Sequence, residues 1–143
     1  MYLLDTNVVS ELRKIRLGCA DAQVAQWADS VAATDLYLSV ITLQELEIGV
    51  LLAKRRDPPQ GAVFRVWLDR HVVPAFAGRI LPIDAAVALR SAQLHVPNPQ
   101  PVRGGLIAAT ALVHGMTVVT RNTADFLPTG VRLLNPWLAA PAL

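Results

Sequence analysis

The chain has 143 residues, which is enough for one domain with a real hydrophobic core and too few for two. Apolar residues make up 53% of the chain and charged residues 17%, and this balance excludes a disordered protein. The formal net charge is +2, and most of the basic residues are arginines, whose guanidinium groups match phosphate oxygens. A nucleic-acid partner therefore stays open, although a codon bias toward arginine would give the same composition.

Membrane insertion, disulfide bonding and zinc binding find no support in the sequence. No apolar run reaches the ~18–20 residues that cross a bilayer, and Asp5 lies where a secretory signal would need basic residues. The single cysteine, Cys19, can form no internal disulfide and fits a reducing cytoplasm. The histidines, His71, His95 and His114, match no zinc spacing. We expect a cytoplasmic protein, away from the membrane, in which any metal ion is held by oxygen ligands.

Apolar segments and turn residues divide the chain into alternating strands and helices. Short apolar stretches predict strands over residues 2–4, 36–40, 79–83, 117–120 and 132–134. Amphipathic patterns and capping residues predict helices over residues 8–14, 42–56, 63–73 and 85–95, after the cap Asp21, and from about residue 103 onward. The segment DPPQG at residues 57–61 predicts a break between two of these helices.

Alternation of short, uniformly apolar strands with helices is typical of a parallel sheet that is covered on both faces. The expected fold class is therefore α/β, a three-layer α/β/α sandwich with a central parallel sheet, in a single domain over residues 1–143. In such sheets, functional sites form beyond the carboxyl ends of the strands.

Three acidic residues follow predicted strands and are candidates for such a site. Asp5 comes directly after the first strand, Glu45 lies one turn into the helix after the second, and Asp125 follows the strand TVVT. If these strands are neighbours, the three carboxylates converge, and clustered carboxylates usually hold Mg²⁺ or Mn²⁺. Such an ion can activate water against a phosphodiester. Three polar neighbours could orient water or a carboxylate: Asn7, Thr120 and Asn122.

Each of these acids also has a structural explanation. Asp5 could cap the helix that follows it, and Thr42 with Glu45 spells a T-x-x-E capping box. Asp125 could stabilise the turn that begins at Asn122. A further strand-end acid, Asp84, lies where a helix N-cap belongs, and we assign it that role. The joint placement of three acids after three strands favours a functional site.

The chain resembles a known family in three blocks of sequence that occur in order. These blocks are YLLDTNVVSEL, SVITLQELEIGV and LIAATALVHGMTVVTRNTADF with the following GVRLLNPW. Together they resemble the PIN-domain family, and within it the VapC/FitB-like toxins of type II toxin–antitoxin pairs. The likeness runs from Met1 to Trp137. It implies a PIN-like α/β/α sandwich, usually a homodimer, that cleaves RNA with Mg²⁺ or Mn²⁺ as cofactor.

The same resemblance implies which residues form the site. The family's first, second and last acids fall on Asp5, Glu45 and Asp125, so the resemblance places them in the metal-binding and catalytic set. Its asparagine after the first acid falls on Asn7, and its hydroxyl residue after the fourth strand on Thr120. The family's partner is a cognate antitoxin that inserts an arginine into the acidic pocket, where a guanidinium replaces the charge of the metal.

One position departs from the family pattern. Members generally read D-[AG]-L-I-A-A-T, whereas this chain has GGLIAAT, so Gly104 replaces the expected metal-binding aspartate. Glycine can still cap a helix at little cost, but it offers no side-chain oxygen to a cation. We therefore expect an impaired ribonuclease toxin, through a change that inactivates an otherwise active enzyme. The alternative is a catalytically dead PIN-like module that binds antitoxin or RNA.

Overall fold

Five short strands form one sheet in the computed structural model, which describes residues 1–138. The strand order is β3-β2-β1-β4-β5 and every pairing is parallel. The strands are β1 (Tyr2–Leu4), β2 (Leu36–Ser39), β3 (Ile80–Leu81), β4 (Thr117–Val119) and β5 (Leu133–Leu134). The predicted parallel sheet is confirmed, with β1 at its centre. The last five residues of the predicted domain, 139–143, lie outside the described residues.

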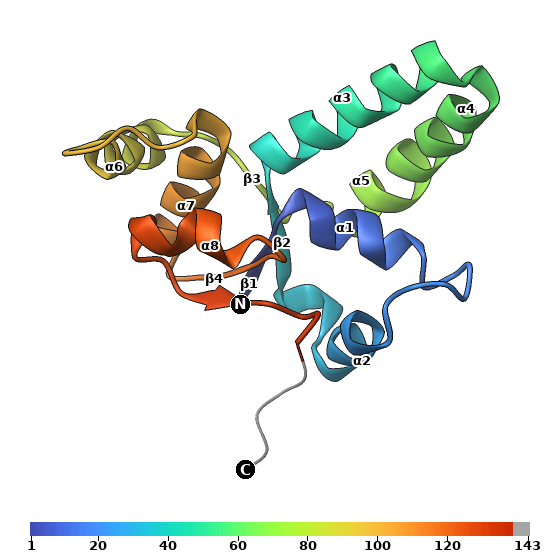
Figure 1. Ribbon diagram of the computed structural model, residues 1–143, viewed down its shortest axis with the longest axis horizontal. Coiled ribbons are helices and arrows are strands. Elements are labelled where there is room, and N and C mark those ends of the chain that lie inside the picture. The colour runs from blue at the N-terminus through green and yellow to red at the C-terminus, as the bar shows by residue number, and fades with distance from the viewer. Residues whose placement is uncertain (139–143) are drawn as a thin grey trace.

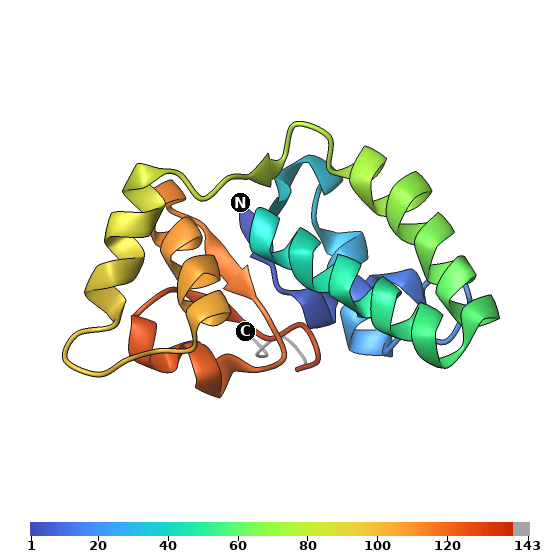
Figure 2. The same ribbon diagram turned by 90° about the horizontal axis from the view of Figure 1, so that it is seen from above.

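Helices cover both faces of the sheet, as Figures 1 and 2 show. The α-helices are α1 (Thr6–Arg13), α2 (Ala22–Ser30), α3 (Val40–Arg56), α4 (Pro58–Trp67), α5 (Val73–Ala75), α6 (Ala85–Leu94), α7 (Val102–His114) and α8 (Thr123–Phe126). Three shorter turns of helix are η1 (Ala33–Asp35), η2 (Leu68–Val72) and η3 (Leu127–Thr129). Helices α3 and α4 form a hairpin that extends away from the sheet (Figure 1).

Alternation along the strands divides the core between the two faces. Leu4 and Val119 point to a core that also contains apolar side chains of α1 and α3. Their neighbours Leu3 and Val118 point the other way, to a core built with α7 and Phe126. Because both faces are buried, the strands are apolar throughout, which confirms the three-layer α/β/α sandwich.

Three predicted helix starts are wrong for the same reason, which is that an earlier residue supplies the cap. The helix predicted over residues 8–14 begins at Thr6, with Asp5 as its N-cap. Helix α3 begins at Val40, because the hydroxyl of Ser39 accepts the N–H of Ile41 at 3.0 Å. Helix α4 begins at Pro58, with Asp57 as its N-cap, so the predicted break is the tight corner of the α3–α4 hairpin. The predicted cap at Asp84 is confirmed, since its carboxylate accepts the N–H of Val87 at 2.9 Å.

The length and hydropathy of the helices bear on whether any of them could span a membrane. Over residues 1–138, no helix combines the length and the apolar character that crossing a membrane requires.

Replacement by alanine at two helical glycines is predicted to change the free energy of unfolding in opposite directions. A Cβ at position 61 would overlap the backbone of Lys54, 2.6 Å from its nitrogen, because α4 packs closely on α3 there. A Cβ at position 104 would meet its nearest neighbour, Pro101, at 3.9 Å. We expect Gly61→Ala to lower the free energy of unfolding by about 1–3 kcal/mol. Gly104→Ala should raise it by about 0.5–1 kcal/mol. Urea denaturation of both variants measures these changes, and equal effects would contradict the packing at Gly61.

Candidate functional site

Asp5 is the most constrained acid of the candidate site. It follows β1 directly, is 8% exposed, and forms the N-cap of α1. Its Oδ1 accepts the N–H of Thr6 at 2.8 Å, and its Oδ2 accepts the hydroxyl of Thr120 at 2.8 Å. The Asn7 amide donates to Oδ2 at 3.4 Å. The capping role is thus confirmed, and the same carboxylate also lines the pocket described below.

Glu45 lies in the second turn of α3 and is held to the first helix of the chain. Its Oε1 accepts the hydroxyl of Thr6 at 2.8 Å. The capping-box interpretation of Thr42 and Glu45 is wrong, because Ser39 caps α3 and Thr42 is buried inside the helix. Glu45 is therefore turned toward Asp5, and Thr6 bridges the two acids through its backbone N–H and its hydroxyl.

Asp125 reaches the site from α8, and its side chain is exposed. Its backbone N–H donates to the carbonyl of Asn122 at 3.1 Å, so the predicted turn is closed by the backbone. Within residues 1–138, no hydrogen bond or ion pair engages the Asp125 carboxylate. The carboxylate is therefore available to a ligand.

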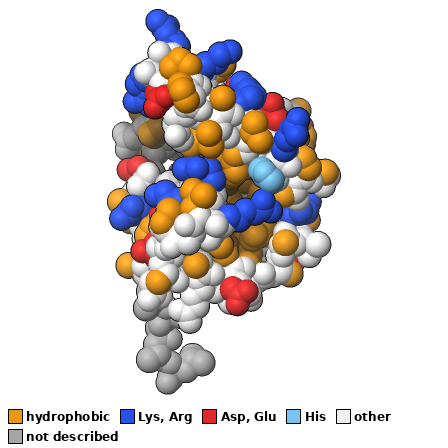
Figure 3. All heavy atoms as spheres, turned by 90° about the vertical axis from the view of Figure 1, so that its right-hand side faces the viewer, with side chains coloured by type: hydrophobic (Ala, Val, Ile, Leu, Met, Phe, Trp, Pro, Cys, Tyr) orange, Lys and Arg blue, Asp and Glu red, His pale blue; other side chains and the backbone are white. Residues whose placement is uncertain are grey.

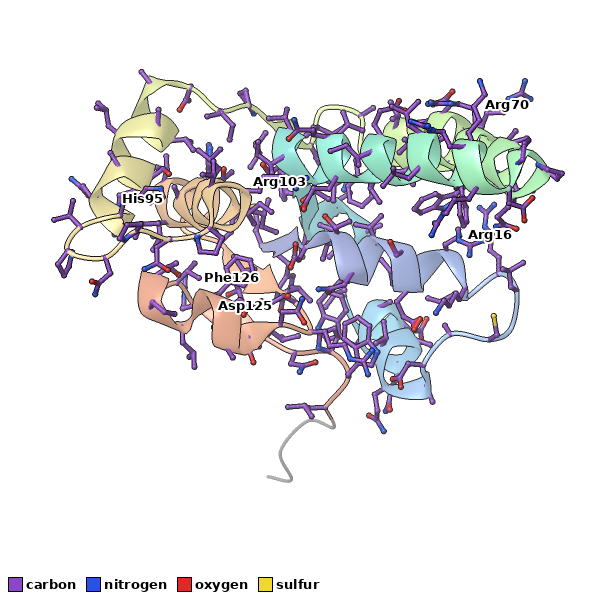
Figure 4. The ribbon with its side chains drawn as sticks, turned by 45° about the horizontal axis from the view of Figure 1, so that its top comes forward. Arg16, Arg70, His95, Arg103, Asp125 and Phe126 are labelled. Carbon is purple, nitrogen blue, oxygen red and sulfur yellow. The ribbon has the colours of Figure 1, made fainter. Side chains whose placement is uncertain are left out.

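These acids line one pocket of about 480 Å³ at the carboxyl ends of the central strands. Its wall includes five predicted site residues: Asp5, Glu45, Gly104, Asn122 and Asp125. The two others, Asn7 and Thr120, lie behind Asp5 and hold it by hydrogen bonds. The pocket lies where α3, α7 and α8 meet, and Figure 4 shows Asp125 and Phe126 on α8 facing the α7 side. The three acids therefore line the same pocket, at one edge of the sheet.

Gly104 is part of the pocket wall, but its local role differs from the expected one. Helix α7 begins at Val102 with Pro101 as N-cap, so Gly104 is the third helical residue and the predicted capping role is wrong. Pro101 supplies no side-chain hydrogen bond to the helix. Since the nearest atom to a Cβ at position 104 is 3.9 Å away, a larger side chain has room there.

Sequence reasoning missed two residues of this site. Thr6 joins Asp5 to Glu45, and the signal for it was a hydroxyl directly beside the first strand-end acid. Arg103 lines the pocket, with its Nη1 3.9 Å from Oε2 of Glu45. The sequence feature that could have identified Arg103 is its position next to Gly104, where the expected acid is missing.

The acid two residues after Glu45 lies outside the pocket. Glu47 pairs with Arg65 of α4, whose Nη1 donates to Oε1 at 2.8 Å. These hydrogen bonds hold the pKa of Glu47 below its ordinary value. The pair ties α3 to α4 on a partly exposed surface.

The donor atoms of the pocket are of the right type for a hard cation but are not arranged for one. Carboxylate and amide oxygens are the ligands that Mg²⁺ and Mn²⁺ favour. Yet among residues 1–138, no three His, Cys, Asp or Glu side chains are grouped so that they could hold a metal ion. The residues present therefore do not fit a complete metal site, and the pocket wall at position 104 is a glycine.

A second concave surface lies between α1, α4 and η2, on the side of the molecule opposite α6. It encloses about 390 Å³ and has an apolar floor that includes Leu12 and Trp67. Three basic or imidazole side chains line it: Arg13, Arg16 and His71. Figure 3 shows this side of the molecule, where Lys, Arg and His side chains surround a hydrophobic hollow. We call it the α1–α4 groove.

Comparisons with known proteins agree with this fold. The model of the PIN domain family matches residues 2–127. Toxin FitB of Neisseria gonorrhoeae is 39% identical over 145 residues, which cover 96% of this chain and 99% of that protein. VapC ribonuclease Y4jK of Sinorhizobium fredii is 40% identical over 142 residues, which cover 96% and 98%.

Solved structures of FitAcB and FitAB are also similar to this chain. A crystal structure of FitAcB from Neisseria gonorrhoeae superposes with a TM-score of 0.85 at 39% identity, covering 96% of this chain and 99% of the other. A structure of FitAB bound to the IR36 DNA fragment gives a TM-score of 0.87 at 38% identity, covering 99% of each chain. The chain belongs to the PIN domain family. Within that family it is similar to the toxin FitB and to a VapC ribonuclease.

The hydrogen bonds behind Asp5 make a testable contribution to stability. Thr120 is fully buried, donates to Asp5 and accepts the N–H of Asn122 at 3.0 Å. We expect Thr120→Val to lower the free energy of unfolding by about 1–3 kcal/mol, because it removes a donor from a buried carboxylate. The matched control is Thr110→Val, also fully buried, whose hydroxyl donates to the Leu106 carbonyl in its own helix. The control should lose less in urea denaturation, and an equal loss would contradict the proposed support of Asp5.

Proposed function

We propose that this chain is the toxin of a toxin–antitoxin pair and carries the site of a Mg²⁺- or Mn²⁺-dependent endoribonuclease that Gly104 impairs. One observation carries the proposal: Asp5, Glu45 and Asp125 line a single pocket whose wall at position 104 is a glycine. The similarity to proteins named as a toxin and as a VapC ribonuclease supports the class of reaction. The proposed unit is the single domain expected over residues 1–143.

The impairment follows from charge and donor count. A side-chain carboxylate in the first turn of α7 would face the pocket, add a negative charge and interact favourably with the helix N-terminus. Glycine supplies none of these. With the described acids not grouped as a metal site, the pocket lacks the ligand arrangement that divalent-cation chemistry needs. We therefore expect the fold to persist and the catalytic activity to be low.

The second candidate function is a catalytically dead module that binds antitoxin or RNA. The same glycine favours it, together with Arg103, which places a positive charge in the pocket wall. The two candidate functions differ in one testable respect. An impaired ribonuclease should gain activity when an aspartate is introduced at position 104, whereas a catalytically dead binding module should not.

The proposed partners are a cognate antitoxin, an RNA substrate and a second copy of the chain. FitAcB and FitAB, similar to this chain at 38–39% identity, support a protein partner. An antitoxin arginine would find three carboxylates in the pocket. The exposed apolar side chains of Ile48, Leu51 and Leu52 on α3 support a homodimer that covers this helix.

Restoring the acid tests the first candidate directly. We expect Gly104→Asp to gain Mn²⁺ binding, measured by isothermal titration calorimetry, and RNA cleavage that depends on added Mn²⁺. The matched control is Gly104→Asn, which has the same size but no charge and should gain much less of either, because an amide is a weaker ligand for a hard cation.

The outcome separates the candidates. If Gly104→Asp folds but gains neither Mn²⁺ binding nor cleavage, the vacant-acid explanation is wrong and the binding module stands. If the original chain already binds Mn²⁺ as tightly as Gly104→Asp, the glycine is not the cause of any impairment.

A further inference from the structure

Arg103 is a pocket residue whose charge has no strong partner in the part of the chain that the structure describes. It is the second residue of α7, and its side chain is 52% exposed. Its nearest carboxylate oxygen, Oε2 of Glu45, is 3.9 Å from Nη1, beyond hydrogen-bond distance. A half-exposed pair at that separation is weak, because water screens both charges. The guanidinium can therefore turn to another anion at small cost.

The surroundings of Arg103 limit which anion that is. Among the described residues lining the pocket, Arg103 is the one base, whereas Asp5, Glu45 and Asp125 are acids. A small anion that entered the pocket would be repelled by these three carboxylates. The pocket therefore disfavours a compact anionic ligand. A phosphodiester of a longer strand can instead place one phosphate at the rim, where Arg103 lies, and keep the rest of the strand outside.

The location of Arg103 leaves room for a phosphate to approach its guanidinium. Figure 4 shows Arg103 at the edge of α7 that faces the start of α3, between the elements that carry Gly104 and Glu45. The neighbouring Gly104 has no side chain and its nearest neighbour to a Cβ is 3.9 Å away, so nothing on that residue blocks the approach of a phosphate. A guanidinium presents parallel N–H donors that match two phosphate oxygens.

We propose that Arg103 binds a backbone phosphate of RNA at the rim of the pocket, and that its contact with Glu45 is the resting position that RNA displaces. This inference rests on the proposed function, because it assumes that RNA is the ligand of the pocket. It assigns Arg103 to substrate binding, and it requires no metal ion. The role therefore operates in the present chain, with glycine at position 104.

Binding of RNA without cleavage tests this role. The probe is a short fluorescein-labelled single-stranded oligoribonucleotide, titrated with the chain in EDTA and followed by fluorescence anisotropy over a series of salt concentrations. We expect Arg103→Gln to weaken binding about tenfold, as the loss of a charged hydrogen bond implies. The slope of log K against log salt should become shallower by about 0.7, the value for one phosphate contact on a single strand.

Two further variants separate a phosphate contact from a general charge effect. Arg103→Lys keeps the charge, so it should keep the salt slope while recovering part of the affinity. Arg70→Gln makes the same charge change at an exposed arginine of η2, at the far end of the molecule in Figure 4, and should leave affinity and slope near those of the parent. If Arg103→Gln and Arg70→Gln behave alike while the parent binds RNA, the role of Arg103 is overturned and the proposed function stands. If the parent binds no RNA at all, both the RNA ligand of the proposed function and this inference fail.

A metal titration excludes a merely structural role. In the Gly104→Asp background, Arg103→Gln should leave Mn²⁺ affinity unchanged or raise it, since it removes a positive charge next to Glu45. Loss of Mn²⁺ affinity together with RNA affinity would mean that Arg103 maintains the shape of the pocket, and would overturn its assignment to substrate binding.

Discussion

The site depends on the buried carboxylate of Asp5, which joins three elements at the centre of the sheet. The backbone N–H of Asp5 donates to the carbonyl of Val119 at the end of β4, and the Asp5 side chain accepts hydrogen bonds from Thr6 and Thr120. These bonds fix the start of α1 against the end of β4. Thr6, positioned in this way, then reaches across to Glu45 on α3. The same interactions that cap a helix therefore also set the spacing of the pocket, so stability and function share one group.

The charge of the pocket explains how the chain tolerates a glycine at position 104. Three acids line the cavity, but they are spread over a buried, a half-buried and an exposed position, so their mutual repulsion is limited. An aspartate at position 104 would add to that repulsion and would need a cation to balance it. Glycine removes the requirement, and Arg103 supplies a positive charge at the rim. The fold is thus compatible with glycine at position 104, and the low activity that we propose would follow from the missing carboxylate.

Local sequence signals predicted most of the fold and the members of the site, but not their individual roles. The alternation of apolar strands and helices was sufficient for the sheet, and Asp84 was recognised as a cap because nothing competes with it. Glu45 was ambiguous, because T-x-x-E is a valid capping box until Ser39 is seen to cap α3 first. Gly104 was taken as a possible cap because the helix was expected to begin at about residue 103, whereas α7 begins at Val102 with Pro101 as its N-cap. Arg103 could not be assigned, because its meaning depends on Glu45, 58 positions earlier in the chain and adjacent only in the folded protein.

We propose that position 104 decides whether the acids of this pocket act together as a cation site. Anomalous diffraction from crystals of the chain and of Gly104→Asp, both soaked in the same Mn²⁺ solution, tests it most directly. We expect a Mn²⁺ peak among Asp5, Asp125 and residue 104 in the aspartate variant and none in the parent. A peak of equal height in the parent would show that position 104 does not control cation binding.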